Sequence, residues 1–439
     1  EKGGRMPAQY PTRPLECWQK AKELRMKQWQ EIMTAGENKK LLVSGMVNGA
    51  APLVMGLGDD VAYMASEPLS ATTLADATFS NECQEVLEAR GFARDLCGYM
   101  RAYMGPVFAD RFPLGGKFPR PDFIFERRWC DTQAKGFQIV AEYLGVPFHC
   151  VDFPVGPGTG ERLERKVDYV TAQYLRAIEW MEGVTGRKWE YDGFLTALQN
   201  EITSRTLWAQ IVDLNTAVPA PLDQKSMYAL FVVTTMMPWK QESVDFHRAL
   251  LDEVRYRVEH GIAALGTERF RLVHEALPPW HYLKLFRTLE AYGAACIGSH
   301  HCILIPGDFR EVGDDLVPAQ PPDELFTGFG NVEEALRFYV RWYLESPMDT
   351  FYLSAQRRSE LVVKIARKWK ADGAILPVNR GCTFGGMGLL ETKLALQEAG
   401  IPAVDYEANL SDPMDFDPVR VLDIMESFLE GQGLAQLPA

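Results

Sequence analysis

Three cysteines stand where the elements of the chain are expected to begin or end. Cys130 closes the predicted strand "RPDFIFERRWC" (120–130), Cys382 closes "GAILPVNRGC" (373–382), and Cys97 lies at the expected start of a helix in "ARDLCGYMRAYMG". Three thiolates suit an iron–sulfur cluster, because its irons prefer sulfur ligands; a fourth iron without a protein thiolate keeps an open position. The alternative is ordinary packing, since free cysteine is often buried.

A second group of soft side chains lies in "CIGSHHC" (296–302). Cys296, His300, His301 and Cys302 are all possible metal ligands. Their spacing matches no familiar zinc pattern, and adjacent histidines on a strand would point to opposite faces. We therefore expect packing or a wall of a substrate site here rather than a metal. Structural roles are predicted for Cys17, Cys83 and Cys150.

Several other chemistries lack their signatures. The chain contains no G-x-x-x-x-G-K-[ST] phosphate loop, no complete G-x-G-x-x-G after a strand, no G-x-S-x-G and no H-E-x-x-H. ATP binding through such a phosphate loop and the common hydrolase mechanisms are therefore unsupported.

Charge and hydropathy exclude further classes. A net charge of −13 over 439 residues argues against a general nucleic-acid binder. No apolar run approaches the roughly 18 residues of a membrane span, and the first residues, "EKGGRMPAQYPTRP", lack the apolar core of a signal peptide. We expect a cytoplasmic protein, with no nucleic acid and no membrane as partner and with mostly free thiols.

The order of elements predicts an α/β fold. Strands are expected at 39–47, 120–130, 145–155, 269–280, 293–300, 373–382 and 400–409, with helices at 131–144 and 389–399. Residues 161–265 have helical periodicity throughout. Alternating strands and helices imply parallel sheets. We predict an N-terminal helical segment (1–38), a first α/β domain (39–160), a helical linker domain (161–265) and a second α/β domain (266–439).

The two α/β halves resemble each other. "FIFERRWC", a helix and "LGVPFHCVDF" correspond to "AILPVNRGC", a helix and "AGIPAVDYEA". This weak repeat puts Cys130 and Cys382 at equivalent positions. Ligands gather at the carboxyl ends of parallel strands. If the halves face each other, the two sulfurs can meet in the cleft between them.

Several segments of the chain resemble a known family. "YPTRPLECWQKAKELR", "SEPLSATT", "ARDLCGYMRAYMG", "FIFERRWC", "PPWHYLKLFRTLE" and "NRGC" followed by "AGIPAVDYEAN" are similar to the benzoyl-CoA reductase and 2-hydroxyacyl-CoA dehydratase family. Within it, the chain most resembles the larger (beta-type) cluster-carrying subunit of ATP-dependent class I benzoyl-CoA reductase. The resemblance covers nearly the whole chain. It implies two flavodoxin-like domains with helical additions, and one 4Fe–4S cluster held by Cys97, Cys130 and Cys382.

The resemblance also implies partners and a reaction. The partners are a homologous smaller cluster-carrying subunit, ATP-hydrolysing electron-activating subunits with further clusters, and ferredoxin as the donor. The reaction is an oxidoreduction of CH–CH groups, in which an aryl-CoA such as benzoyl-CoA is dearomatised to a cyclic dienoyl-CoA. The thioester helps by stabilising a ketyl-type radical anion. Two alternatives stay open: a 2-hydroxyacyl-CoA dehydratase subunit, which recycles the electron, and a non-catalytic electron-relay subunit.

Candidate residues follow from that reaction. Protonation of the substrate needs a nearby acid, for which we consider His281, His300 and His301. Trp280 is a candidate wall of the acyl pocket. The CoA phosphates need cations, and the candidates beside the predicted cluster ligands are Arg127, Arg128 and Arg380. These arginines could instead be structural ion-pair partners.

Overall fold

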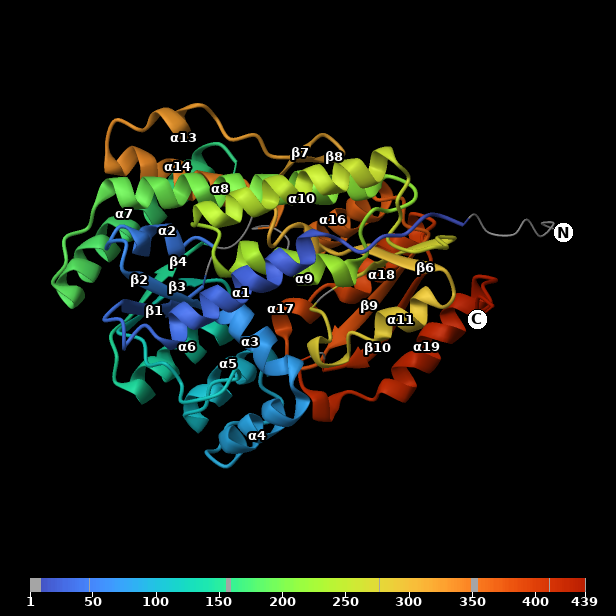
Figure 1. Cartoon of the computed structure of the whole chain (residues 1–439), viewed down its shortest axis with the longest axis horizontal. Helices are drawn as coiled ribbons and strands as arrows, with labels where there is room; N and C mark the ends of the chain where they lie inside the picture. Colours follow the sequence, from blue (N-terminus) through green and yellow to red (C-terminus); the bar gives the residue numbers. More distant parts are fainter. Residues whose placement is uncertain are drawn as a thin grey trace.

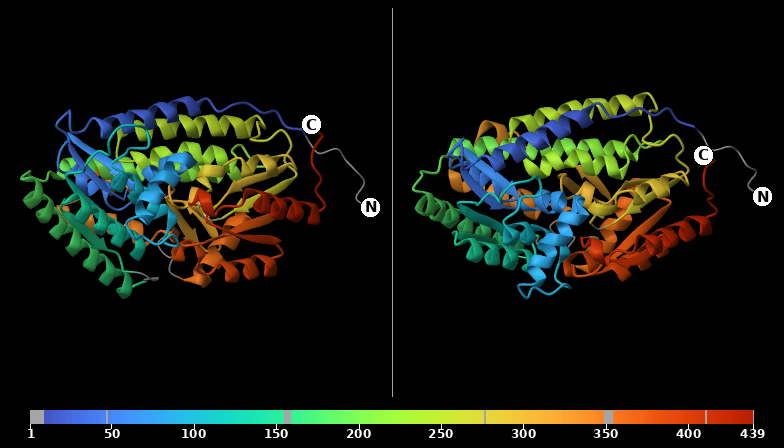
Figure 2. Two further views of the ribbon diagram at one scale, coloured as in Figure 1. Left: turned by 90° about the horizontal axis from the view of Figure 1, so that it is seen from below. Right: turned by 60° about the horizontal axis from the view of Figure 1, so that its bottom comes forward.

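Two parallel sheets, one from each half of the chain, lie side by side beneath a layer of long helices (Figures 1 and 2). The computed structural model describes residues 9–46, 48–154, 159–275, 277–348, 354–409 and 411–438. The arrangement confirms the predicted α/β class with parallel sheets.

The first sheet has the strand order β2–β1–β3–β4. Its strands are β1 (Leu41–Gly45), β2 (Val61–Ala65), β3 (Phe123–Arg128) and β4 (Phe148–Asp152). Val43 pairs with Tyr63 on one side and Phe123 on the other, all in parallel register. β1 and β2 are buried along their whole length, which explains why they read as apolar runs rather than as alternating patterns. β2 was not predicted from the sequence.

The second sheet has the order β10–β9–β5–β6, made of β5 (Phe270–His274), β6 (Ala294–Gly298), β9 (Gly373–Asn379) and β10 (Ala403–Ala408). Counted along the chain within each half, both sheets run second, first, third, fourth. This is the beginning of the flavodoxin-like order, in which ligands bind between the first and third strands. Cys130 follows β3 and Cys382 follows β9, the third strand of each sheet, so the internal repeat is confirmed.

Four helices cover both sheets: α1 (Cys17–Met33), α8 (Tyr191–Asp213), α9 (Gln224–Met236) and α10 (Gln241–Glu259) (Figure 2). Buried tryptophans fasten this layer, since Trp208 Nε1 donates to the Cys302 carbonyl at 2.8 Å and Trp369 Nε1 to the Val212 carbonyl at 2.8 Å. The helices predicted between 161 and 265 are confirmed, and the domain boundaries stay a prediction. No helix in the described part of the chain has both the length and the apolarity of a bilayer span.

The remaining elements connect or flank the sheets. They are α2 (Ala51–Met55), α3 (Ser66–Ala75), α4 (Ala77–Glu88), α5 (Gly98–Ala109), α6 (Asp131–Leu144), α7 (Glu161–Thr185), η1 (Leu214–Thr216), η2 (Trp280–Tyr282), α11 (Leu285–Glu290), α12 (His300–Ile303), β7 (Phe309–Val312), β8 (Asp315–Pro318), α13 (Glu324–Thr327), α14 (Val332–Leu344), α16 (Ala355–Lys368), α17 (Thr383–Gly386), α18 (Leu389–Glu398), η3 (Pro413–Asp415) and α19 (Pro418–Gly431).

One placement differs from the sequence-based expectation. His300 and His301 do not lie on a strand, because β6 ends at Gly298 and Ser299 caps the short helix α12. Gly298 has a φ of 156° and Ser299 accepts a hydrogen bond from the backbone N–H of Cys302, so the chain turns there. Both histidines therefore stand at the carboxyl end of β6 and both are buried.

Candidate active site between the two sheets

The carboxyl ends of strands from both sheets meet around one cavity of about 130 Å³. Its walls come from the segments that follow β1, β2, β3, β5, β6 and β9. They are Met46, Ser66, Glu67, Ser70, Cys97, Tyr99, Met100, Tyr103, Trp129, Cys130, Gln133, Leu277, His300, His301, Ile305, Cys382 and Gly385. A complete acyl-CoA needs a larger pocket, so this space suits a compact group or the acyl end of such a ligand.

All three predicted cluster cysteines line this cavity. Cys97 and Cys130 occupy the N-cap positions of α5 and α6, and Cys382 directly precedes α17. Backbone N–H groups point at the sulfurs: Gln133 N lies 3.4 Å from Cys130 Sγ and Gly385 N lies 3.1 Å from Cys382 Sγ. The fold therefore brings together three cysteines that lie far apart in the sequence, and their role as cluster ligands stays a prediction.

The electrostatics of the three thiols differ. A hydrogen bond from the Cys382 thiol, with backbone N–H groups of Met100 and Tyr99, lowers the pKa of Cys97 to about 7. Burial raises the pKa of Cys130 to about 11. At neutral pH, Cys97 is thus the thiol of the three that most readily loses its proton.

Two glycines let the halves approach closely enough to bring Cys97 beside Cys382. A Cβ on Gly98 would lie 2.9 Å from the Ser411 carbonyl oxygen of the second half. Conversely, a Cβ on Gly381 would lie 3.0 Å from the Asp95 carbonyl oxygen of the first half, and its φ of +78° also favours glycine. Each half therefore contributes one residue without a side chain to the contact beside the sulfurs.

These residues fit a three-thiolate cluster. Three sulfurs line one largely apolar space, backbone N–H groups approach each of them, and a Cβ on Gly385 would stand 3.2 Å from Cys382 Sγ. Over the described ranges, no group of three or more His, Cys, Asp or Glu side chains is placed to hold a single metal ion, "CIGSHHC" included. A cluster spreads its ligands over several irons and so does not need that tight grouping.

A carboxylic acid and a histidine face each other across the same cavity. Glu67 follows β2 on α3, and its Oε1 lies 3.6 Å from Nε2 of His301. Burial raises the pKa of Glu67 to about 7. Burial, with His300 nearby, lowers the pKa of His301 to about 3, and neither of its ring nitrogens has a hydrogen-bond partner among the described residues. At neutral pH, His301 is uncharged and Glu67 retains its proton in a substantial fraction of molecules.

His300 belongs to a second acid–histidine pair. Its Nδ1 contacts Oε2 of Glu275, and its backbone N–H donates to Oε1 of Glu275 at 3.1 Å. Burial opposes ionisation of Glu275, but His300 and Arg358 outweigh it and lower the pKa of this carboxyl below its usual value. Burial also lowers the pKa of His300, against the effect of Glu275. An ionised Glu275 therefore holds a neutral His300 at the cavity wall.

Two further candidates lie outside the residues that line the cavity. Trp280 packs on Tyr228 with ring centroids 5.4 Å apart. His281 packs edge-on against Phe416 at 5.0 Å, and burial lowers its pKa to about 4. Their assignments as acyl-pocket wall and proton donor stay predictions.

The three candidate arginines have intramolecular contacts. Arg127 is buried with its guanidinium 3.7 Å from the centre of the Phe153 ring. Arg128 forms ion pairs with Asp131 at 3.0 Å and Asp152 at 2.6 Å. Arg380 pairs with Glu407 at 3.2 Å and Asp415 at 2.8 Å. For Arg128 and Arg380 this geometry matches the structural alternative, and their role toward CoA phosphates stays a prediction.

Sequence reasoning missed both carboxylates of the cavity region. Glu67 stands in "SEPLSATT", two residues after a strand that was not predicted, so its place at a carboxyl strand end could not be seen. Glu275 fell inside the predicted strand 269–280, although β5 ends at His274. The usable signal was an acidic residue directly after a buried apolar run, but it depended on the strand boundaries.

Comparisons with known proteins identify the family of the chain. The model of the family "2-hydroxyglutaryl-CoA dehydratase, D-component" matches residues 61–430. The chain is 24% identical over 371 residues to the (R)-phenyllactyl-CoA dehydratase alpha subunit of Clostridium sporogenes, covering 83% of each chain. It is 23% identical over 350 residues to the (R)-2-hydroxyisocaproyl-CoA dehydratase alpha subunit of Clostridioides difficile, covering 77% of each. The closer resemblance to benzoyl-CoA reductase stays a prediction, whereas the chain plainly belongs to the 2-hydroxyglutaryl-CoA dehydratase D-component family.

Proposed function

We propose that this chain is the cluster-bearing subunit of an enzyme that performs one-electron chemistry on CoA thioesters, as a 2-hydroxyacyl-CoA dehydratase. The observation that supports it is the meeting of Cys97, Cys130 and Cys382 in a cavity that is also lined by one acid, Glu67, and by His300, which Glu275 contacts from outside the cavity. The three thiolates would hold a 4Fe–4S cluster, which would supply low-potential one-electron chemistry toward the thioester.

The protein residues then handle the two protons of a dehydration. Removal of water from a 2-hydroxyacyl group breaks the C2–O bond and one C3–H bond, so it needs one acid and one base. Glu67, whose pKa is about 7, gives its proton to the leaving hydroxyl. His300 takes the proton of C3 on Nε2, because Nδ1 is engaged with Glu275. One proton is given and one taken, and the electron is returned, so the reaction is redox-neutral overall.

The cavity walls support the same function in a second way. Tyr99, Tyr103 and Trp129 line the space, and Phe231 packs on His301 from behind at 5.8 Å. Such walls exclude water from a radical intermediate and suit an aromatic or branched acyl group. The phenyllactyl-CoA and 2-hydroxyisocaproyl-CoA dehydratases to which the chain is similar are named for acyl groups of this kind.

Aryl-CoA reduction is the second candidate, because the aromatic walls and the motif resemblance fit a benzoyl group. That reaction adds two electrons and two protons to the ring, so it consumes reductant where dehydration only recycles an electron. In both cases we propose a homologous second subunit, an ATP-hydrolysing subunit that delivers the electron, and ferredoxin as its source. The electron-relay alternative is less favoured, since the cysteines share their cavity with proton-transferring groups.

An anaerobic assay of the complete complex separates these functions. The full chain, purified with its partner subunits, is supplied with ATP and reduced ferredoxin and given either (R)-phenyllactyl-CoA or benzoyl-CoA. Formation of the unsaturated acyl-CoA with catalytic amounts of reductant supports the dehydratase. Ring reduction with stoichiometric reductant supports the reductase. If a complex with full iron content forms neither product, both catalytic functions are overturned and the electron-relay function remains.

A further inference from the structure

A buried carboxylate outside the cavity holds one of the cavity histidines by two bonds. Glu275 follows β5 directly and is 0% exposed, while His300 is 2% exposed at the start of α12. Oε1 of Glu275 accepts from the backbone N–H of His300 at 3.1 Å, and Oε2 engages Nδ1 of its ring. Two bonds from one carboxylate fix both the position of the residue and the orientation of its ring.

The Glu275–His300 pair lies close to β9 and to the segment that follows Cys382. The backbone N–H of Glu275 donates to the Ile375 carbonyl at 2.9 Å, which ties it to β9, the strand that leads to Cys382. Arg358 from α16 is buried nearby, and its Nη1 donates at 2.8 Å to the Met387 carbonyl in the segment after Cys382. The backbone of Glu275 is therefore anchored to the strand that leads to Cys382.

The charge balance around His300 comes from several elements. The charged groups near His300 are Arg358 on α16 and Glu275 after β5. The other titratable groups around it are His301, next to it on α12, His274, which precedes Glu275 on β5, and Glu67, which faces the cavity from α3. Only Glu275 bonds directly to the His300 ring among these groups. A negative charge at Nδ1 favours the tautomer that carries its proton there.

We propose that Glu275 is a positioning residue that keeps the proton of neutral His300 on Nδ1, so that Nε2 is the atom that accepts a proton from the bound acyl group. This inference rests on the proposed function for the role of His300 and adds the residue that makes that role possible. After the transfer, the imidazolium is stabilised by Glu275, which keeps its own charge, as in the histidine–aspartate pairs of hydrolases.

The tautomer can be measured without turnover. The full cluster-free chain is labelled with ¹⁵N-histidine, and the His300 signals are identified among the seven histidines by their loss in His300→Asn. We expect a protonated Nδ1 and an unprotonated Nε2 in the wild type, and loss of this preference in Glu275→Gln. Glu201→Gln is the matched control, because it removes another fully buried carboxylate, one that accepts a hydrogen bond from Tyr343. The inference is overturned if Nε2 carries the proton in the wild type or if E275Q keeps the wild-type tautomer.

Kinetics of the complete complex give a second readout. E275Q should lower kcat by about 10²-fold to 10⁴-fold with little change in KM, and E275D should restore part of it. Without the carboxylate the imidazolium is less stable, so the pKa of His300 falls and the acid limb of the pH–rate profile moves to lower pH. The positioning role would be rejected if the acid limb of the E275Q pH–rate profile stays in place and E275Q loses no more kcat than E201Q. If H300N itself keeps full activity, the proposed function of His300 fails instead, while the tautomer measurement still decides what Glu275 does.

Discussion

Cys97, Cys130 and Cys382 each stand at the boundary of an element, where a side chain can reach the cavity while nearby backbone N–H groups remain available to the sulfur. Cys150 and Cys296 differ, because they lie within strands β4 and β6 and line no part of this cavity. For these five cysteines, the position within the element therefore separates the three candidate ligands from the two cysteines in strands.

Substitution of Cys97, Cys130 or Cys382 by serine should weaken or abolish binding of the cluster. A hydroxyl is a harder and weaker ligand for iron than a thiolate, so we expect a drop in cluster affinity of more than about 10-fold. Anaerobic iron and sulfide analysis with EPR measures it on the full chain. Cys296→Ser serves as the control and should retain the signal. Loss of the signal in C296S with retention in C382S would mean that the ligand set is wrong.

If Glu67 is the acid of the reaction, its protonation should set how the turnover rate of the complex depends on pH. Burial holds its pKa at about 7, and as an acid it works only while protonated, so the rate should fall as pH rises above about 7. Glu67→Gln cannot give a proton and should lower kcat by about 10²-fold to 10⁴-fold and remove this alkaline limb. The pH–rate profile of the complex checks it, with the surface variant Glu164→Gln as control. A Glu67→Gln enzyme with the full rate and the limb intact would exclude the acid role.

At the scale of elements, α5 is tied to the second half of the chain by one buried arginine. Nη1 of Arg101 donates to Asp412 at 3.2 Å and to the Arg94 carbonyl at 2.8 Å, and Nη2 pairs with Glu88 at 2.6 Å. Arg101 lies one turn after Cys97 on α5, so this ion-pair network fixes the helix that presents the sulfur.

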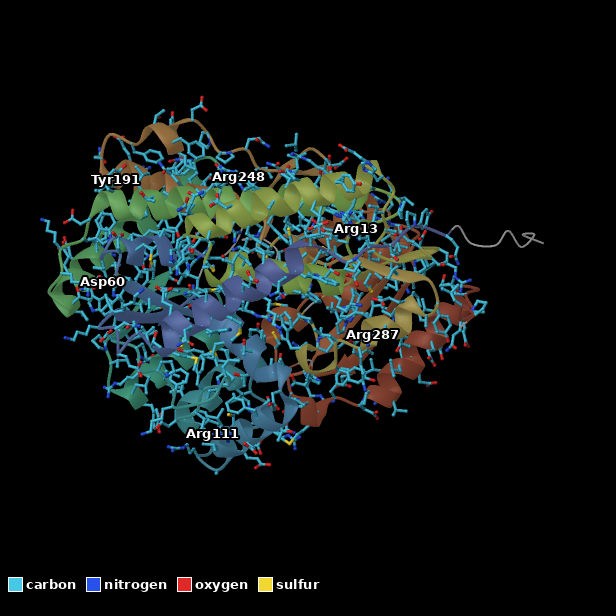
Figure 3. All side chains as sticks on the ribbon, in the orientation of Figure 1. Arg13, Asp60, Arg111, Tyr191, Arg248 and Arg287 are labelled. Carbon is cyan, nitrogen blue, oxygen red and sulfur yellow. The ribbon has the colours of Figure 1, made fainter. Side chains whose placement is uncertain are left out.

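Arg101→Met should therefore destabilise the fold and loosen the cluster site. It leaves Asp412, which is 0% exposed, without its closest counter-charge, and breaking a buried pair from one side costs about 3–5 kcal/mol. Denaturant unfolding of the full chain measures this free energy. Arg111→Met is the matched control, because Arg111 pairs with Glu82 at the surface near α4 (Figure 3) and such pairs contribute less than about 1 kcal/mol. Equal effects of the two substitutions would contradict the role given to Arg101.

The close approach of the two halves can be tested at one glycine. Gly381→Ala meets both a φ of +78° and a carbonyl oxygen at 3.0 Å, so it should push the Cys382 segment away from Cys97. Gly400→Ala has the same φ of +78° but nothing within 4 Å, so it reports the conformational cost alone, at about 1 kcal/mol. We expect lower iron content after anaerobic reconstitution only in G381A. Similar iron content in both variants would show that the contact does not set the cysteine geometry.

For the whole molecule, buried neutral histidines make stability depend on pH. Burial lowers the pKa of His247 and of His274 to about 4. As the pH falls from the ordinary value of about 6.5 to about 4, the unfolded chain takes up protons that the folded chain refuses, so the free energy of unfolding decreases in this window.

His247→Asn should reduce this acid sensitivity. Asparagine can donate to the Ser243 carbonyl that Nδ1 of His247 contacts at 2.6 Å, but it does not titrate. Urea unfolding at pH 7 and pH 5 should show a smaller loss for the variant than for the wild type. His260→Asn, at the solvent-facing end of α10, should behave like the wild type. An H247N chain that loses as much stability as the wild type would show that His247 is accessible to protons in the folded state.

The sequence by itself determined the α/β class, most strands, and the equivalence of Cys130 and Cys382, because local apolar runs and a repeated strand–helix–strand pattern carry this information. It also marked Cys97, His300 and His301 as chemically capable residues. It missed β2, because "VAYMA" is a five-residue run without alternation, and with it the place of Glu67.

Only the tertiary structure decided which of these side chains meet. The distance between Cys97 and Cys382 depends on how the two sheets face each other, and that is set by contacts far apart in sequence, such as Gly98 with Ser411 and Arg101 with Asp412. The pairing of Glu275 with His300 likewise depends on β5 lying between β6 and β9. Local patterns fix which residue types stand at strand ends, whereas long-range packing fixes which strand ends share one cavity.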